Sequence, residues 1–159
     1  MLAAGLLLGI GLGGFVDGIV LHQILQWHHL LTSEGSHPAS TVAGLEANTL
    51  ADGLFHALAW LAVCVGLWLL WRAGRRAPVA LRGRRLVGLM LAGWGLFNLV
   101  EGLVDHQLLG IHHVKLGAEG DPVVALDVAF LAFGALLLLV GSALARSLDV
   151  YPVRGRASG

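Results

Sequence analysis

The sequence predicts an all-α integral membrane protein, a four-helix bundle made of two tandem two-helix repeats. Three observations carry this prediction: an apolar composition, four long apolar stretches and an internal repeat. Of the 159 residues, 57% are hydrophobic and 13% are charged, whereas a soluble domain carries about 25% charged residues. The composition argues against a water-soluble globule, a disordered chain and a nucleic-acid binder.

Each apolar stretch is long enough to cross a bilayer as a helix, which takes about 20 residues. None shows the alternation of a strand, and a helix satisfies its own backbone hydrogen bonds in lipid. The predicted spans are Leu2–Leu31, Ala47–Trp71, Leu86–His113 and Pro122–Ala145.

Basic residues lie almost entirely on one side of the predicted membrane. Six arginines fall within residues 72–85 and three more lie from Arg146 onward, while the two other connections hold only Lys115. The positive-inside rule then places both termini in the cytoplasm and the histidine-rich ends of the spans outward.

The first half of the chain matches the second at a shift of 84 residues, which pairs His22 with His106 and Asp17 with Glu101. The even-numbered spans match more weakly, at a shift of 75, which pairs Asp52 with Asp127. We therefore expect a single transmembrane domain over 1–159, with repeat halves at about 1–75 and 84–148 and a cytoplasmic tail at 149–159. Glycines that recur every four residues in the first span are interpreted as helix contacts.

Acidic and imidazole groups inside the spans are the main functional signal. The spans hold five carboxylates and seven histidines, but no lysine or arginine before their cytoplasmic ends. Buried charges need partners, so protons or bound cations must compensate these groups. Imidazole together with carboxylate favours a transition metal such as zinc, iron or copper.

A helix rises about 1.5 Å per residue, so His22, His56 and His106, on three different predicted helices, lie at nearly the same depth in the membrane. We predict a mono- or dinuclear site in the outer half of the bundle. Its expected ligands are His22, His56, His106, Glu101, Asp52, Asp17 and Asp127. A second set lies nearer the outer surface and is expected to form an outer metal site or an access route: His28, His29, His112, His113 and Asp105.

The relation between Asp17 and His22 stays open at this point. Five residues of straight α-helix turn the chain by a net angle of about 140°, which puts the two side chains on different faces. A bend or local bulge at Gly18 would bring them together.

The run from Gly13 to His29 (GGFVDGIVLHQILQWHH), with Asp52–His56 (DGLFH) and Glu101–His106 (EGLVDH), resembles an uncharacterised family of small four-span bacterial membrane proteins. The resemblance covers nearly the whole chain. It implies four spans in the bacterial inner membrane and a domain of unknown function. In some bacteria, genes of this family lie near genes for haem-copper oxidase assembly factors. The resemblance therefore implies a respiratory oxidase or its assembly factors as a partner.

The sequence thus predicts a metal-binding membrane protein, with the lipid bilayer and a metal ion as its partners, and leaves open whether it is an enzyme. Metal storage or delivery, and redox or hydrolytic chemistry, all fit. One alternative is haem binding, with His22 and His106 as axial ligands. The other is a proton or cation transporter that uses the paired carboxylates, for which four spans would require a homodimer.

Overall fold

We describe the protein from a computed structural model, which describes residues 1–32, 35–76, 83–115 and 121–146. Its described residues are helical, with no strand, and four helices are long and apolar enough to cross a membrane. The predicted all-α architecture with four spans is therefore confirmed. The tail predicted at 149–159 lies outside the described residues. The elements in chain order are α1 (Leu2–Val16), η1 (Asp17–Ile24), α2 (Val42–Arg76), α3 (Gly83–Glu101), η2 (Gly102–Leu108) and α4 (Asp121–Arg146), where η marks a π-helical turn.

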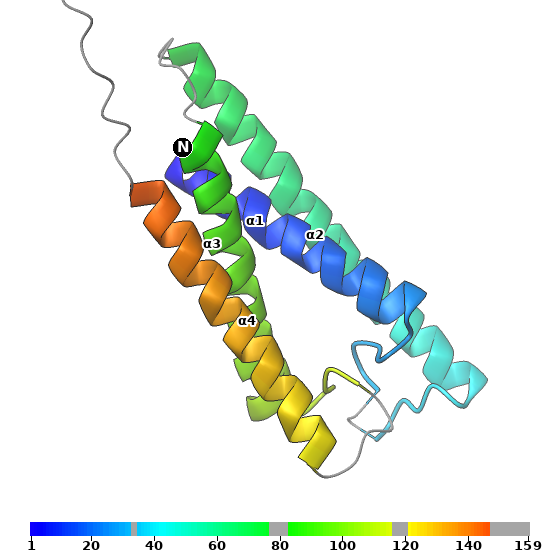
Figure 1. The fold of residues 1–159 in the computed structure, drawn as a ribbon. Coiled ribbons are helices and arrows are strands. Elements are labelled where there is room, and N and C mark those ends of the chain that lie inside the picture. Colours follow the sequence, from blue (N-terminus) through cyan, green and yellow to red (C-terminus); the bar gives the residue numbers. More distant parts are fainter. Residues whose placement is uncertain (33–34, 77–82, 116–120, 147–159) are drawn as a thin grey trace, which may run out of the picture.

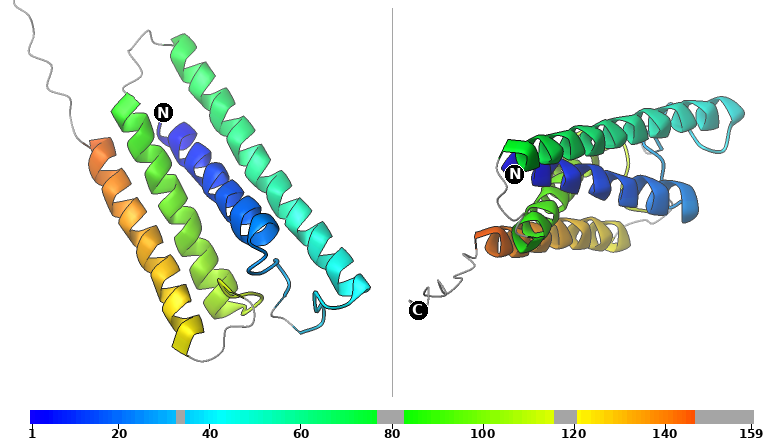
Figure 2. Two further views of the ribbon diagram at one scale, coloured as in Figure 1. Left: turned by 45° about the vertical axis from the view of Figure 1, so that its right-hand side comes forward. Right: turned by 90° about the horizontal axis from the view of Figure 1, so that it is seen from above.

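The four helices pack side by side in the order α2, α1, α3, α4 (Figures 1 and 2). Helix α1 contacts α2 and α3, and α3 contacts α4, whereas α2 and α4 do not touch within the described residues. The outer helices expose large apolar side chains such as Leu58 and Leu139, which suits contact with lipid. The buried residues are concentrated between α1 and α3. The candidate site therefore lies at the junction of the two halves.

Glycines allow the two central helices to cross at close range. A Cβ at Gly9 would overlap the carbonyl oxygen of Met90, and a Cβ at Gly93 would overlap that of Leu6. Without a hydrophobic drive between helices in lipid, such backbone contact is a main source of packing energy. The glycine spacing in the sequence therefore corresponds to a real helix contact.

The first and third helices end earlier than predicted. They stop at Ile24 and Leu108, not at Leu31 and His113. Just beyond, Gln26 and Gly110 adopt positive φ angles of 49° and 61°. Such left-handed residues terminate helices and reverse the chain.

Backbone hydrogen bonds close both reversals in the same way. The amide of Trp27 bonds to Leu21 O at 2.9 Å, and the amide of Ile111 bonds to Asp105 O at 3.0 Å. The prediction of uninterrupted spans was wrong here because apolar composition alone does not mark where a helix turns. The reversal carries the segments that follow back against the bundle.

Candidate metal centre

The π-helical turns bring together residues that a straight α-helix would separate. In η1, Asp17 Oδ2 lies 3.1 Å from His22 Nε2, although the two residues are five apart. A π-helix bonds residue i to residue i+5, so these positions align along the axis. Of the two arrangements left open by the sequence, the local bulge is the one the protein adopts. The second π-helical turn, η2, begins directly after Glu101 and contains His106, and Glu101 Oε1 lies 3.5 Å from His112 Nε2.

Four buried side chains meet in a compact cluster: His22, His28, Glu101 and His112. Each offers one nitrogen or oxygen, and these four atoms lie within 4.8 Å of one another. Zinc–nitrogen bonds of about 2.0–2.1 Å would place tetrahedral ligands about 3.4 Å apart. A modest contraction of the cluster would therefore close it around an ion.

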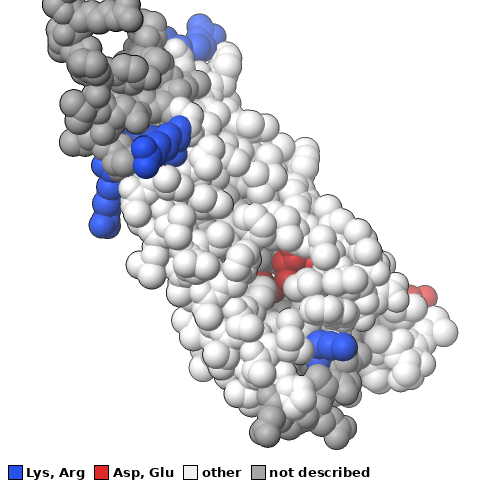
Figure 3. All heavy atoms as spheres, in the orientation of Figure 1, with Lys and Arg blue, Asp and Glu red and all other residues white. Residues whose placement is uncertain are grey.

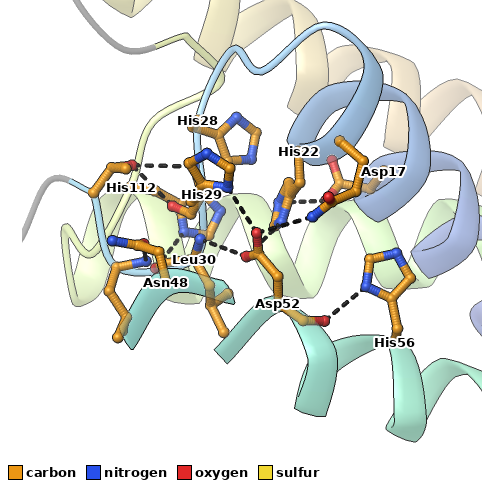
Figure 4. Close-up of polar contacts among 12 residues, drawn as sticks. Asp17, His22, His28, His29, Leu30, Asn48, Asp52, His56 and His112 are labelled. Atoms are coloured by element: carbon orange, nitrogen blue, oxygen red, sulfur yellow. Dashed lines mark hydrogen bonds and ion pairs between the residues drawn. The ribbon is translucent and has the colours of Figure 1, made fainter. Parts of the chain in front are cut away.

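The four residues come from four different segments. His22 lies on η1 and Glu101 ends α3, whereas His28 and His112 lie on the segments that follow the two chain reversals. Figure 4 shows His22, His28 and His112 converging beside Asp17. The early helix ends are thus what places the last two histidines inside the protein.

His106 and Asp17 extend this cluster to six side chains, which we call the His/carboxylate centre (His22, His28, His106, His112, Asp17 and Glu101). The rings of His28 and His112 stack at 4.6 Å, and the ring of His106 lies 4.8 Å from that of His112. On the other side, the ring of His22 lies 4.5 Å from that of His28. The imidazoles therefore form one continuous group.

The Nδ1 atom of each imidazole faces a protein oxygen at the rim of the centre. His22 Nδ1 forms a hydrogen bond of 2.9 Å with Asp52 Oδ1, whereas His106 Nδ1 lies 3.4 Å from Asp127 Oδ1 without forming a hydrogen bond. A carboxylate or carbonyl partner on Nδ1 fixes that nitrogen as the donor and leaves Nε2 with a free lone pair. This is the arrangement typical of metal-binding histidines.

The other two imidazoles are held across the junction of the halves. His28 Nδ1 donates to Val114 O at 2.9 Å, and His112 Nδ1 donates to Leu30 O at 3.3 Å. Each histidine is therefore anchored by the main chain of the opposite half.

Buried polar atoms of the centre lack hydrogen-bond partners. Among the described residues these include Nε2 of His28 and His112, both ring nitrogens of His106, Asp17 Oδ1 and Glu101 Oε2, whereas His22 Nε2 and Asp17 Oδ2 face each other at 3.1 Å. His22 and His112 are 0% exposed, so water does not reach them readily. Buried polar groups are nearly always paired, so these nitrogens and oxygens are candidate ligand atoms.

Asp52 and Asp127, both predicted as ligands, lie at the rim. Asp52 Oδ2 accepts from His29 Nδ1 at 2.7 Å, and its Oδ1 accepts from the amide of Leu30 at 3.0 Å. Asp127 receives His113 Nδ1 at 2.7 Å in the equivalent way. Their oxygens are thus engaged in orienting imidazoles, and the outer histidines His29 and His113 bind these carboxylates instead of facing the centre.

His56, also predicted as a ligand, stands apart from the centre (Figure 4). Its Nδ1 donates to Asp52 O at 2.7 Å within its own helix, and its ring packs over Gly18. At the equivalent place in the second half, Leu131 packs over Gly102. His56 and Leu131 thus occupy equivalent packing positions beside the two π-helices. Asp105 is half-buried on η2 and is absent from the four-residue cluster.

The comparison with family models decides where the chain belongs. Residues 4–148 match the family described as "Predicted membrane protein (DUF2243)". The chain belongs to this family. No curated protein and no solved structure matches the chain.

In this DUF2243 member, His28 and His112 are held neutral near pH 7. These two histidines lie beyond the ends of η1 and η2. Burial lowers the pKa of His28 to about 4, with the nearby His22 adding to the effect. Burial also lowers the pKa of His112, to about 2, and His28 contributes. Neutral imidazole is the form that binds metal, so neither side chain has to lose a proton first.

Sequence reasoning placed His28 and His112 near the outer surface because it treated the spans as straight. One signal was present in the sequence: Gly110 directly follows the last apolar residues of its helix, where glycine commonly ends helices. The anchoring carbonyls of Leu30 and Val114 left no such signal, because any residue type supplies a carbonyl oxygen.

Proposed function

We propose that this membrane protein binds one or two transition metal ions, such as zinc, iron or copper, in the His/carboxylate centre. The observation that carries the proposal is the convergence of four buried ligand atoms within 4.8 Å, three of them imidazole nitrogens. Imidazole and carboxylate are the ligands that these metals share in proteins.

The balance of charge supports a cation. Asp17 and Glu101 interact electrostatically in the buried centre. The described basic side chains lie elsewhere: Arg72 and Arg75 cover tryptophans of α2, and the Lys115 ammonium lies 5.7 Å from the ring centroid of Trp27. A metal ion would compensate two carboxylates in a region where uncompensated charge is costly.

The geometry favours metal over haem. The rings of His28 and His112 both contact His22 and His106, so they occupy the space that a macrocycle would need between two axial ligands. The proposed role is metal handling or metal-dependent redox or hydrolytic chemistry. A respiratory oxidase or its assembly factors are the proposed recipients in the bacterial inner membrane.

The proposed orientation has both termini in the cytoplasm and the centre in the outer half of the membrane. The positive-inside rule supports it, since Arg72 and Arg75 lie in the last turns of α2, at the end of that helix opposite the centre (Figure 1).

Metal analysis of the detergent-purified protein tests the proposal. The wild-type protein, reconstituted with zinc, iron(II) or copper, should retain at least one of these metals after desalting. His28→Ala and His112→Ala should each lose most of it, because each removes a buried imidazole from the cluster.

His56→Ala is the matched control, because this histidine lies on the same side of the membrane but outside the centre. It should bind as much metal as the wild type. Failure of the wild type to retain any of the three metals would overturn the proposal. So would an equal loss of metal in His56→Ala and His28→Ala, with all proteins folded by circular dichroism.

A further inference from the structure

A lateral cavity opens from the lipid-facing surface toward the His/carboxylate centre. It has a volume of about 170 Å³ and lies between α1, η1, α3 and α4. Figure 3 shows acidic side-chain atoms in a hollow near the middle of the face drawn there, with uncharged residues immediately around them. The residues that line the cavity are Gly13, Val16, Asp17, Val20, Leu21, Trp94, Asn98, Phe130 and Phe133.

The cavity changes character from its mouth to its floor. At the mouth, Val16 and Phe133 are 42% and 45% exposed, so this end faces lipid. At the floor, Asp17 and Asn98 are 4% and 3% exposed. Asp17 Oδ2 lies 3.1 Å from His22 Nε2, whereas Asp17 Oδ1 has no hydrogen-bond partner among the described residues. An apolar entrance that leads to a polar floor is typical of a small-molecule site.

The size and lining of the cavity indicate which kind of ligand it can bind. An apolar cavity of about 150 Å³ is large enough to bind benzene. Here the walls include the aromatic rings of Trp94, Phe130 and Phe133, and the first and last of these meet edge to face at 6.1 Å. At the floor, Asp17 Oδ1 can accept a hydrogen bond, and the amide of Asn98 can donate or accept one.

A second cavity shows that the polar floor is a specialised feature. It lies at the equivalent place in the other half, between α1, α2 and α3, and has nearly the same volume, about 180 Å³. There, Gly14 stands at the position equivalent to Asn98, and Phe97 at that equivalent to Gly13. The lining of this second cavity contains no carboxylate and no amide side chain. Two equivalent spaces have therefore diverged, and one of them alone reaches a polar group of the centre.

We propose that the cavity beside Asp17 and Asn98 binds a lipid-soluble molecule with a single aromatic ring and a hydroxyl group, that is, a phenol or the ring of a quinol, which enters from the bilayer. The ring occupies the aromatic walls and the hydroxyl group reaches the polar floor. This inference goes beyond metal binding, because it assigns a second ligand to the protein.

Photolabelling with a trifluoromethyl-diazirinyl phenol tests the inference on the full-length protein in lipid nanodiscs, with labelled residues mapped by mass spectrometry. Label should appear on Val16, Val20 or Phe133. p-Cresol should compete about five- to tenfold better than toluene, compared at equal membrane concentration, because toluene has the same ring but forms no hydrogen bond.

Two variants and a matched control complete the experiment. Val16→Trp should block the mouth and abolish labelling there, whereas Val100→Trp, the equivalent lipid-facing position in the second half, should leave it unchanged. Asn98→Leu should remove the advantage of p-cresol over toluene. Equal competition by p-cresol and toluene in the wild type would overturn the proposal and indicate a purely apolar space, as would unchanged labelling in Val16→Trp.

Metal content is measured on the same samples, so the two proposals fail separately. Loss of metal binding with intact, hydroxyl-dependent labelling would overturn only the metal proposal. Intact metal binding without hydroxyl-dependent labelling would overturn only the cavity proposal.

Discussion

Asp52 shows how much of the candidate centre depends on residues around the ligands. Its carboxylate accepts from His22, His29, Gln23 and the amide of Leu30. These contacts fix the ring of His22 and direct its Nε2 inward. The sequence predicted Asp52 as a ligand, since a carboxylate one helical turn from a histidine fits either role equally well.

Replacing Asp52 by asparagine should therefore weaken metal binding without removing a ligand. We expect Asp52→Asn to lower the affinity about 10- to 100-fold, the usual effect of losing a carboxylate that orients a metal-binding histidine. Competition titration of the purified protein with a metallochromic chelator measures this. Glu46→Gln, an exposed carboxylate on the same helix, is the control and should have wild-type affinity. Unchanged affinity in Asp52→Asn would contradict the role described here.

Several residues of the centre could be predicted from the sequence because the spans contain so few polar groups. Asp17, His22, Glu101 and His106 all lie in apolar segments, and the structure places each of them in the centre. His28 and His112 were assigned to the surface instead. Their true position depends on a reversal of the backbone, which residue types near a membrane surface do not reveal.

At the scale of elements, the two chain reversals differ in their left-handed residue. Gln26 has a positive φ of 49° without being glycine, whereas the equivalent position is Gly110. Left-handed backbone costs a residue with a side chain about 1 kcal/mol relative to glycine. A Cβ at Gly110 would meet nothing within 4 Å, so only this conformational cost would apply there.

The two positions should respond in opposite directions. Gln26→Gly should raise the free energy of unfolding by about 0.5–1 kcal/mol, and Gly110→Ala should lower it by about 1 kcal/mol. Unfolding in sodium dodecyl sulfate, followed by circular dichroism, provides the measurement. A change of the same sign at both sites would argue against the left-handed conformation at one of them.

The crossing of α1 and α3 makes a further prediction about elements. Gly9→Ala places a methyl group against the carbonyl oxygen of Met90, so the two helices must separate. We expect a loss of about 1–3 kcal/mol in the free energy of unfolding. Gly53→Ala on α2 is the control, because its Cβ would meet nothing within 4 Å. Since alanine favours the helix, this control should be neutral or stabilising by up to about 1 kcal/mol.

At the scale of the whole molecule, the number of helices and their membrane-spanning character could be predicted because composition and length determine both. The side-by-side order α2, α1, α3, α4 could not, since it depends on which glycine faces meet. The same contacts recur in both halves. The pair His22–Asp52 corresponds to His106–Asp127, at a shift of 84 residues for the histidines and 75 for the aspartates. The repeat boundaries at about 1–75 and 84–148 remain a prediction.

The proposed orientation can be measured directly. In a Cys64→Ala background, Ser40→Cys should react with a membrane-impermeant maleimide in intact spheroplasts, because it is exposed between η1 and α2 on the outer side. Gly74→Cys, exposed near the opposite end of α2, should react only after the membrane is permeabilised. The reverse pattern would invert the proposed orientation.

The exchanged carbonyl contacts, His28 to Val114 and His112 to Leu30, mean that neither two-helix unit can assemble the centre by itself. A free-standing ancestor of such a unit would have needed a second copy of itself to hold an ion. Joining both copies in one polypeptide makes the pairing permanent and frees each copy to acquire its own substitutions. Asn98, at the position equivalent to Gly14, is an example of such a substitution: an asymmetric feature in an otherwise symmetric core.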